Sequence, residues 1–155
     1  MKIKVIGTGQ SLRGDDAAGL EAVKLWQVRH PESAARVQVE LSELPGLGLL
    51  DLLEGVEAAI IVDAVQDTTS VGNVLCLGMD ELAGFIPGSG SAHGWGVAET
   101  LQLGKAVAPA LEKCRITLIG IVGKDFRMGT GLSPEVRKAL ARAVEMLESE
   151  IQSLL

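Results

Sequence analysis

Two acids and one histidine stand at positions where they could bind a metal ion or move a proton. Asp16 follows a glycine-rich turn, Asp63 interrupts the apolar run AAIIVDAV, and His93 lies in the Gly/Ser-rich stretch FIPGSGSAHGWG. Two carboxylates and one imidazole form an incomplete ligand shell for a divalent cation such as Zn²⁺ or Ni²⁺, with positions left for water or substrate. The three residues lack the close spacing of an HExxH helix, so the fold must bring them together.

Each acid also has a structural interpretation. Asp16 could stabilise a helix N-terminus through the helix dipole, an effect of about 0.3–1 kcal/mol at an exposed site, and we favour that role for Asp15. Asp63 could be a hydrogen-bonded cap, although an ionised carboxylate in an apolar strand is costly unless it is paired, hydrogen-bonded or metal-bound. His30 suits the cation position at a helix C-terminus.

The elements that would position these residues alternate between strand and helix. The helix after the glycine-rich turn should begin at Asp15 or Asp16 and end near His30, because Pro31 disfavours helical geometry before it. Ser133 and Pro134 suit the N-cap and first position of a long amphipathic helix. Strands are expected at 2–7, 37–41, 58–65, 71–77 and 115–122, and further helices at 47–53 and 97–108.

This order predicts an α/β fold, a three-layer α/β/α arrangement with a mostly parallel twisted sheet of about five strands, similar to phosphorylases and hydrolases. A chain of 155 residues without repeats or linkers is expected to form one domain over 1–155. Ligands of such folds bind beyond the carboxyl ends of the strands. The three candidates stand at such places: Asp16 after the first strand's turn, Asp63 at the end of a strand, and His93 in a loop before a helix. They could therefore converge there.

Composition excludes several classes of protein. A net charge of −6 argues against a nucleic-acid partner, which requires a basic surface. The first residues are too weakly apolar for a signal peptide, and no run approaches a membrane span. Cys76 and Cys114 are far apart, as in a reduced intracellular protein. We therefore expect a cytoplasmic protein with two buried structural thiols.

Two other enzyme classes fit poorly. GTGQSLRG follows a strand but fails the GxGxxG spacing, and an acidic pair at the helix start would repel phosphate. A serine hydrolase would need a GxSxG elbow, and both cysteines fall in or beside strands instead of at a helix N-terminus. His93 paired with Cys76 or Cys114 is the remaining thiol alternative.

Three motifs, VIGTGQSLRGDDAAG, IIVDAV and SAHGWG, together resemble the hydrogenase maturation proteases, and the order of elements agrees across nearly the whole chain. The resemblance implies a nickel-dependent endopeptidase, of aspartic or metal-assisted type, that removes a carboxyl-terminal tail from the [NiFe] hydrogenase large-subunit precursor after nickel insertion. It assigns catalysis and metal contact to Asp16, Asp63 and His93. Gln10 departs from the family, which commonly has Asn there, and SAHGWGV differs from many relatives after the histidine.

The resemblance also implies the partners. We expect the nickel to be that of the precursor, no organic cofactor, no membrane partner, and a monomeric enzyme. Water could be activated by a carboxylate or by the metal. The alternatives are a non-cleaving checkpoint or chaperone for the nickel site, and a hydrolase of small molecules, which would need a closed pocket.

Overall fold

The structure, a computed structural model, describes residues 1–43, 48–67, 69–84, 97, 100–102, 104 and 109–155. These residues form a five-stranded sheet in the order β2-β1-β3-β5-β4. The strands are β1 (Ile3–Thr8), β2 (Gln38–Ser42), β3 (Ala58–Gln66), β4 (Val74–Gly78) and β5 (Arg115–Gly123). Neighbours pair in parallel, except that β4 is antiparallel to β5 at one edge.

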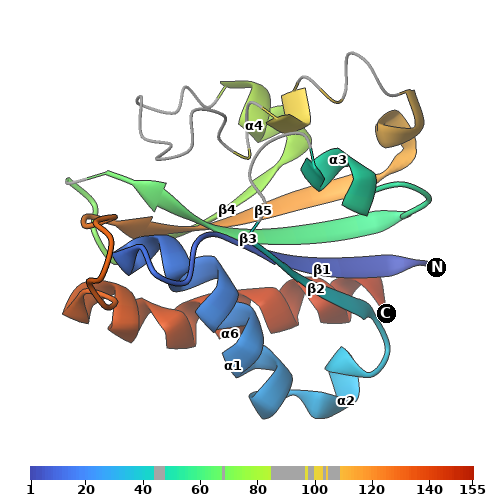
Figure 1. Cartoon of the computed structure of the whole chain (residues 1–155). Coiled ribbons are helices and arrows are strands. Elements are labelled where there is room, and N and C mark those ends of the chain that lie inside the picture. The colour runs from blue at the N-terminus through green and yellow to red at the C-terminus, as the bar shows by residue number, and fades with distance from the viewer. Residues whose placement is uncertain (44–47, 68, 85–96, 98–99, 103, 105–108) are drawn as a thin grey trace.

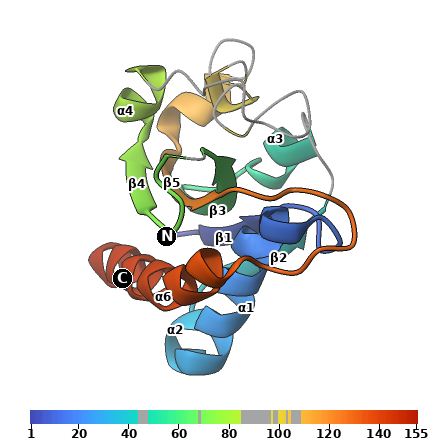
Figure 2. The ribbon, with the colours of Figure 1, turned by 90° about the vertical axis from the view of Figure 1, so that its left-hand side faces the viewer.

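Helices cover both faces of the sheet (Figure 1). The lower face in that view carries α1 (Ala18–Arg29), α2 (Pro31–Ala34) and α6 (Pro134–Leu154), and the upper face carries α3 (Gly48–Leu52) and α4 (Met79–Gly84). Two short 3-10 helices, η1 (Gly14–Ala17) and η2 (Pro109–Lys113), complete the described elements. Seen from the side, the sheet lies between the two helical layers (Figure 2). The predicted three-layer α/β fold is confirmed.

Each face of the sheet has its own apolar core, because successive side chains of a strand point to opposite faces. Below the sheet, Ile60 and Val62 of β3 belong to a cluster that includes the fully buried Trp26. Above it, Ile61 belongs to a second cluster with Leu101. Burial on both faces explains the continuous apolar run of β3, and each buried Leu, Ile or Val contributes about 1.5–3 kcal/mol.

The expected boundaries are confirmed within one or two residues for β1, β2, β3 and β5. The segment at 71–77 differs, because residues before Val74 form a turn in which the Gly72 N–H donates to the Val122 carbonyl at 2.8 Å. Gly72 has a φ of +89°. A connection this short cannot contain the crossover that a parallel strand needs, so β4 returns antiparallel. That one strand departs from the expected parallel pairing.

The carboxyl-terminal helix is confirmed from Pro134 onward, with Val136, Val144, Leu147 and Ile151 buried and Leu140 partly buried. Residues 120–123 complete β5, and the loop that leads to α6 follows them. Positions 97, 100–102 and 104 are helical, and the rest of the predicted helix at 97–108 lies outside the described residues. Within the described part of the chain, no helix has the length and apolarity to cross a membrane.

Candidate functional site

Asp63 lies near the carboxyl end of β3, beside the end of β1. The β1–β3 pairing runs to Gly7 opposite Val62, which places Thr8 next to Asp63. Ile6 and Ile61 both belong to the upper cluster, and side chains two residues apart share a face. Thr8 and Asp63 therefore face the upper layer together, at the carboxyl ends of the strands, where ligands of parallel α/β proteins bind.

The Asp63 carboxyl is withdrawn from solvent, although the residue as a whole is only partly buried. Burial, with a smaller contribution from the charge of Asp16, raises the pKa of Asp63 to about 7, against the opposing effect of hydrogen bonds from Thr8 and the Ala64 backbone. The Thr8 hydroxyl also lies 3.3 Å from the Val62 carbonyl, to which it donates. Asp63 consequently exchanges its proton near neutral pH, as a general acid or base must.

Asp16 is placed by the glycine-rich turn that follows β1. It lies in η1, is 3% exposed, and its N–H donates to the Arg13 carbonyl at 3.0 Å. A Cβ on Gly9 would lie 2.0 Å from the Asp16 carbonyl oxygen, and Gly9 has a φ of +141°. Gly9 is thus required for the chain to fold back and bring Asp16 toward Asp63. The structure brings these two predicted site residues together.

His93, the third predicted site residue, lies outside the described residues. Its proposed convergence with Asp16 and Asp63 stays a prediction. In the described ranges no group of three or more His, Cys, Asp or Glu side chains is arranged to hold a metal ion. Of the three predicted ligands, the structure describes Asp16 and Asp63.

Asp15 has a role that the sequence interpretation missed. It is fully buried, and its carboxylate accepts hydrogen bonds from the N–H groups of Lys124 at 3.0 Å, Asp125 at 3.2 Å and Ser133 at 2.7 Å. The Ser133 hydroxyl donates to it at 2.9 Å. Gly123 makes this approach possible, since a Cβ there would lie 2.6 Å from the Asp15 Cβ. Asp15 ties the loop at 124–133 to η1 instead of serving a helix dipole.

Ser133 stands at the N-cap of α6 as expected, but its hydroxyl makes no capping hydrogen bond to the helix. Local capping was the only signal readable from its neighbours in sequence. The partner it uses, Asp15, is 118 residues away. The doubled acid of the RGDDAAG motif was the signal that two different roles were needed there.

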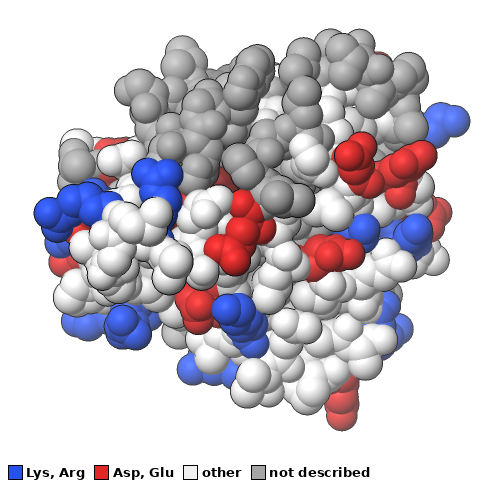
Figure 3. All heavy atoms as spheres, in the orientation of Figure 1, with Lys and Arg blue, Asp and Glu red and all other residues white. Residues whose placement is uncertain are grey.

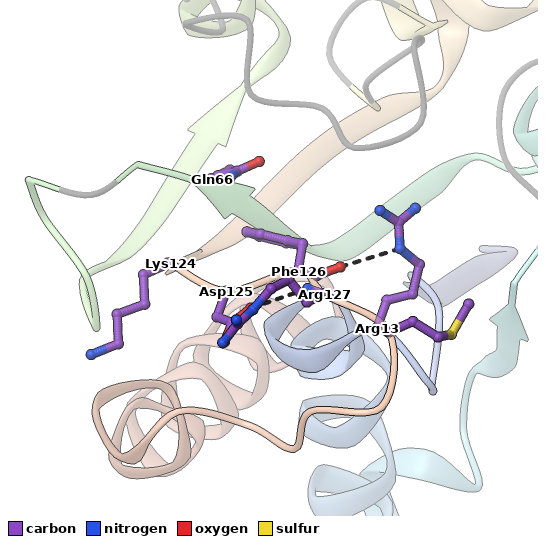
Figure 4. Close-up of a pocket in the computed structure, with 7 residues that line it drawn as sticks. Arg13, Gln66, Lys124, Asp125, Phe126 and Arg127 are labelled. Atoms are coloured by element: carbon purple, nitrogen blue, oxygen red, sulfur yellow. Dashed lines mark hydrogen bonds and ion pairs between the residues drawn. The ribbon is translucent and has the colours of Figure 1, made fainter.

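An open groove of about 930 Å³ lies between the glycine-rich turn, the end of β3 and the loop after β5. We call it the Arg13–Met128 groove, and it is lined by Arg13, Gln66, Lys124, Asp125, Phe126, Arg127 and Met128. In Figure 4, Gln66 lies above Asp125 and Phe126, and Arg13 lies to their right. The groove residues flank both predicted acids in sequence, since Arg13 precedes Asp16 by one helical turn and Gln66 ends the strand that carries Asp63.

The two cysteines are unpaired with each other. Cys114 is buried as expected, but Cys76 is only partly buried, which corrects that prediction because β4 lies at the edge of the sheet. Burial, with the nearby charge of Glu150, raises the pKa of Cys76 to about 11. Burial also raises the pKa of Cys114. Neither environment favours the thiolate that a cysteine nucleophile needs.

Comparison with known proteins places this architecture in a family. The family model described as hydrogenase maturation protease matches residues 44–150. A Methanocaldococcus jannaschii protein assigned as a hydrogenase maturation protease is 31% identical over 160 residues, covering 97% of this chain and 96% of the relative. The hydrogenase 2 maturation protease of Escherichia coli is 26% identical over 150 residues, covering 95% of this chain and 88% of that protein.

A solved structure agrees with these relatives. The [NiFe] hydrogenase maturation protease HybD from Thermococcus kodakarensis superposes with a TM-score of 0.74 at 27% identity, covering 97% of this chain and 99% of that one. The family model, the sequence relatives and the fold all lead to the same assignment. This chain belongs to the hydrogenase maturation protease family.

Proposed function

We propose that this chain is the endopeptidase that removes the carboxyl-terminal tail of a [NiFe] hydrogenase large-subunit precursor after nickel insertion. Asp16, Asp63 and His93 contact the precursor's nickel in this proposal. Its main structural support is a pair of acids. Asp63, near the carboxyl end of β3, has a pKa near 7, and Asp16, in η1 after the neighbouring strand β1, contributes to that shift. Membership of the maturation protease family supports the peptidase class.

The donor chemistry of the pair suits a divalent cation. Carboxylate oxygens bind such ions readily, and the charge of Asp16 already makes it harder to ionise Asp63. A cation between the two carboxylates would offset that repulsion and lower the pKa of Asp63. The nickel enters as part of the substrate, so only a loaded precursor would convert Asp63 fully to its charged form. Metal occupancy would thereby act as the signal for cleavage.

Two chemical routes are compatible with this arrangement. In the first, the Asp63 carboxylate takes a proton from water as the water oxygen bonds to the scissile carbonyl carbon. The protonated Asp63 then returns the proton to the amide nitrogen as the C–N bond breaks. In the second, the precursor's nickel polarises the scissile carbonyl or the attacking water. Both routes need Asp63 ionised before attack.

The test is incubation of the protein with nickel-loaded and nickel-free precursor, with tail loss measured by intact mass. We expect cleavage of the loaded precursor only, and a loss of at least about 100-fold in the Asp63→Asn variant. Asp51→Asn, the same change at an exposed position of α3, is the matched control and should cleave at the wild-type rate.

Three results would contradict the proposal. Equal cleavage of loaded and nickel-free precursor would remove nickel recognition from it. Stable binding of the loaded precursor with no mass change would instead assign the protein a non-cleaving checkpoint function. Full activity in Asp63→Asn would exclude Asp63 from the reaction.

A further inference from the structure

The Arg13–Met128 groove is built from two segments that the fold locks together. The Arg13 Nε donates to the Phe126 carbonyl at 3.2 Å, and the Gly129 N–H donates to the Leu12 carbonyl at 2.8 Å. Asp15 holds the same loop from beneath through its four accepted hydrogen bonds. A groove held this firmly needs little ordering when a ligand binds, which favours affinity.

The charge of the groove opposes that of the whole chain. Three of its lining residues are cationic, Arg13, Lys124 and Arg127, and one is anionic, Asp125, whereas the chain carries a net charge of −6. Figure 3 shows Lys and Arg gathered at the left-hand end of the molecule, where the loop after β5 lies in Figure 1. In Figure 4 the terminal nitrogens of Arg13 point away from Phe126.

Ion pairs within this region do not cancel its attraction for an anion. Arg127 forms a bidentate pair with Asp125, whose side chain is 26% exposed, and Lys124 contacts Glu135 at 3.0 Å, where both side chains are 44% exposed. The Lys124–Glu135 pair is of the exposed kind that exchanges readily, and the guanidinium of Arg127 has N–H groups beyond the two that donate to Asp125. A ligand with several carboxylates could therefore interact with all three cations, and its approach would be steered by their field.

The same rim presents two large apolar side chains to solvent. Leu12 and Met128 are each 70% exposed, and the hydrogen bond from Gly129 to Leu12 joins their segments. Exposed apolar groups beside a groove are typical of protein-binding surfaces, and Met is well suited to adapt to a partner. The combination fits a polypeptide better than a small anion.

Resting on the proposed function, we infer that the Arg13–Met128 groove docks an acidic segment of the large-subunit precursor. The groove's cations hold carboxylates of that segment, and Met128 and Leu12 contact an apolar side chain within it. Docking there places the adjoining residues of the precursor at the carboxyl ends of the strands, where Asp16 and Asp63 lie. The groove thus selects the partner, while the acids act on the metal and the scissile bond.

Photo-crosslinking tests the occupant directly. Met128→benzoylphenylalanine places the crosslinker on the rim, and Val28→benzoylphenylalanine, at a 78% exposed position of α1, is the control. With nickel-loaded precursor, we expect Met128 to capture one segment containing more Asp and Glu than Lys and Arg. Capture of a basic segment, or no capture above the Val28 control, would overturn the inference.

Charge reversal tests the contribution of the cations. We expect Arg13→Glu and Arg127→Glu to raise the Kd for the loaded precursor about tenfold or more, and most strongly at low salt. Lys138→Glu, the same charge change at an exposed site on α6, should leave the Kd unchanged within about twofold. Arg127 is 80% exposed, so Arg127→Glu still tests the contribution of the cations if Arg13→Glu fails to fold.

The outcomes separate the two proposals. If the wild type cleaves the precursor and both groove variants bind like Lys138→Glu, the groove inference fails alone. If the wild type binds through the groove but never cleaves, the protease proposal fails and the inference stands. Failure of the wild type to bind any precursor would overturn both.

Discussion

Asp63 and Glu148 are both acids withdrawn from solvent, yet their surroundings move their pKa values in opposite directions. Burial dominates at Asp63 and raises its pKa to about 7. Burial acts on Glu148 too, but hydrogen bonds from Trp26, Ser33 and Gln152 outweigh it and lower the pKa. Those donors lie at 2.8, 2.7 and 2.8 Å. A carboxylate with enough donors stabilises the fold, whereas one with too few is available for chemistry.

The two acids also occupy different regions. Glu148 joins α1, α2 and α6 below the sheet, where His30 adds a contact at 3.7 Å. Asp63 faces the upper layer at the carboxyl end of the parallel strands. The lower layer is thus the region where Glu148 contributes to stability, and the strand ends hold the carboxyl group with the raised pKa. The comparison predicts opposite effects of the same kind of substitution.

The largest effect is expected from Asp63→Asn on stability above neutral pH. A pKa raised from 3.8 to about 7 means that the folded state loses stability as pH rises between these values, on the order of 4 kcal/mol in all. Asn imitates the protonated acid, so the variant should be more stable than the wild type at pH 8 and similar at pH 4. Urea unfolding at both pH values measures this, and equal stability at pH 8 would contradict it.

Asp15→Ala should be the most destabilising of these changes, by about 3 kcal/mol. The substitution removes the acceptor of four hydrogen bonds and leaves backbone N–H groups of the 124–133 loop unsatisfied. Hydrogen exchange should be faster at the amides of Lys124, Asp125 and Ser133. Equilibrium unfolding measures the total loss of unfolding free energy. A loss below about 1 kcal/mol would show that water replaces the carboxylate.

Glu148→Gln should cost about 1–2 kcal/mol at pH 7, because the amide has one acceptor oxygen where the carboxylate uses both, and a neutral oxygen accepts more weakly. The wild-type pKa is lowered, so its stabilisation is present above the unfolded-state pKa and is lost as pH falls through the folded-state pKa. The difference between the variant and the wild type should therefore shrink on acidification. A difference that stays constant from pH 7 to pH 3 would contradict the assigned cause.

Glu145→Gln provides the smallest expected effect and the matched control on the same helix. Its contact with Arg142 is 3.7 Å long, and both side chains are largely exposed. Solvent and salt screen such pairs. We expect no change in unfolding free energy beyond measurement error, and a measurable loss would show that helix position, instead of hydrogen-bond supply, explains Glu148.

The spacing of apolar residues predicted the fold, because it indicates which side chains of each helix or strand are buried. The acid in AAIIVDAV was recognisable as unusual, because a charged side chain is costly in a strand that is buried on both faces. The structure shows Asp63 near the carboxyl end of β3 with a raised pKa. The amphipathic pattern after Ser133 likewise predicted α6 from Pro134 onward. The antiparallel direction of β4 does not follow from the residues of β4 itself, because it is set by the short connection from β3.

The amino-acid sequence by itself determined the layered α/β fold, helices α1, α3 and α6, most strands, and the positions of Asp16 and Asp63 beside strand ends. Only the tertiary structure decided that Asp15 holds a loop while Asp16 acts on Asp63, and that Glu148 is stabilised by residues more than 110 positions away. Turns and buried faces follow from neighbouring residues, but the pKa of a carboxylate follows from the donors, charges and water that packing leaves around it.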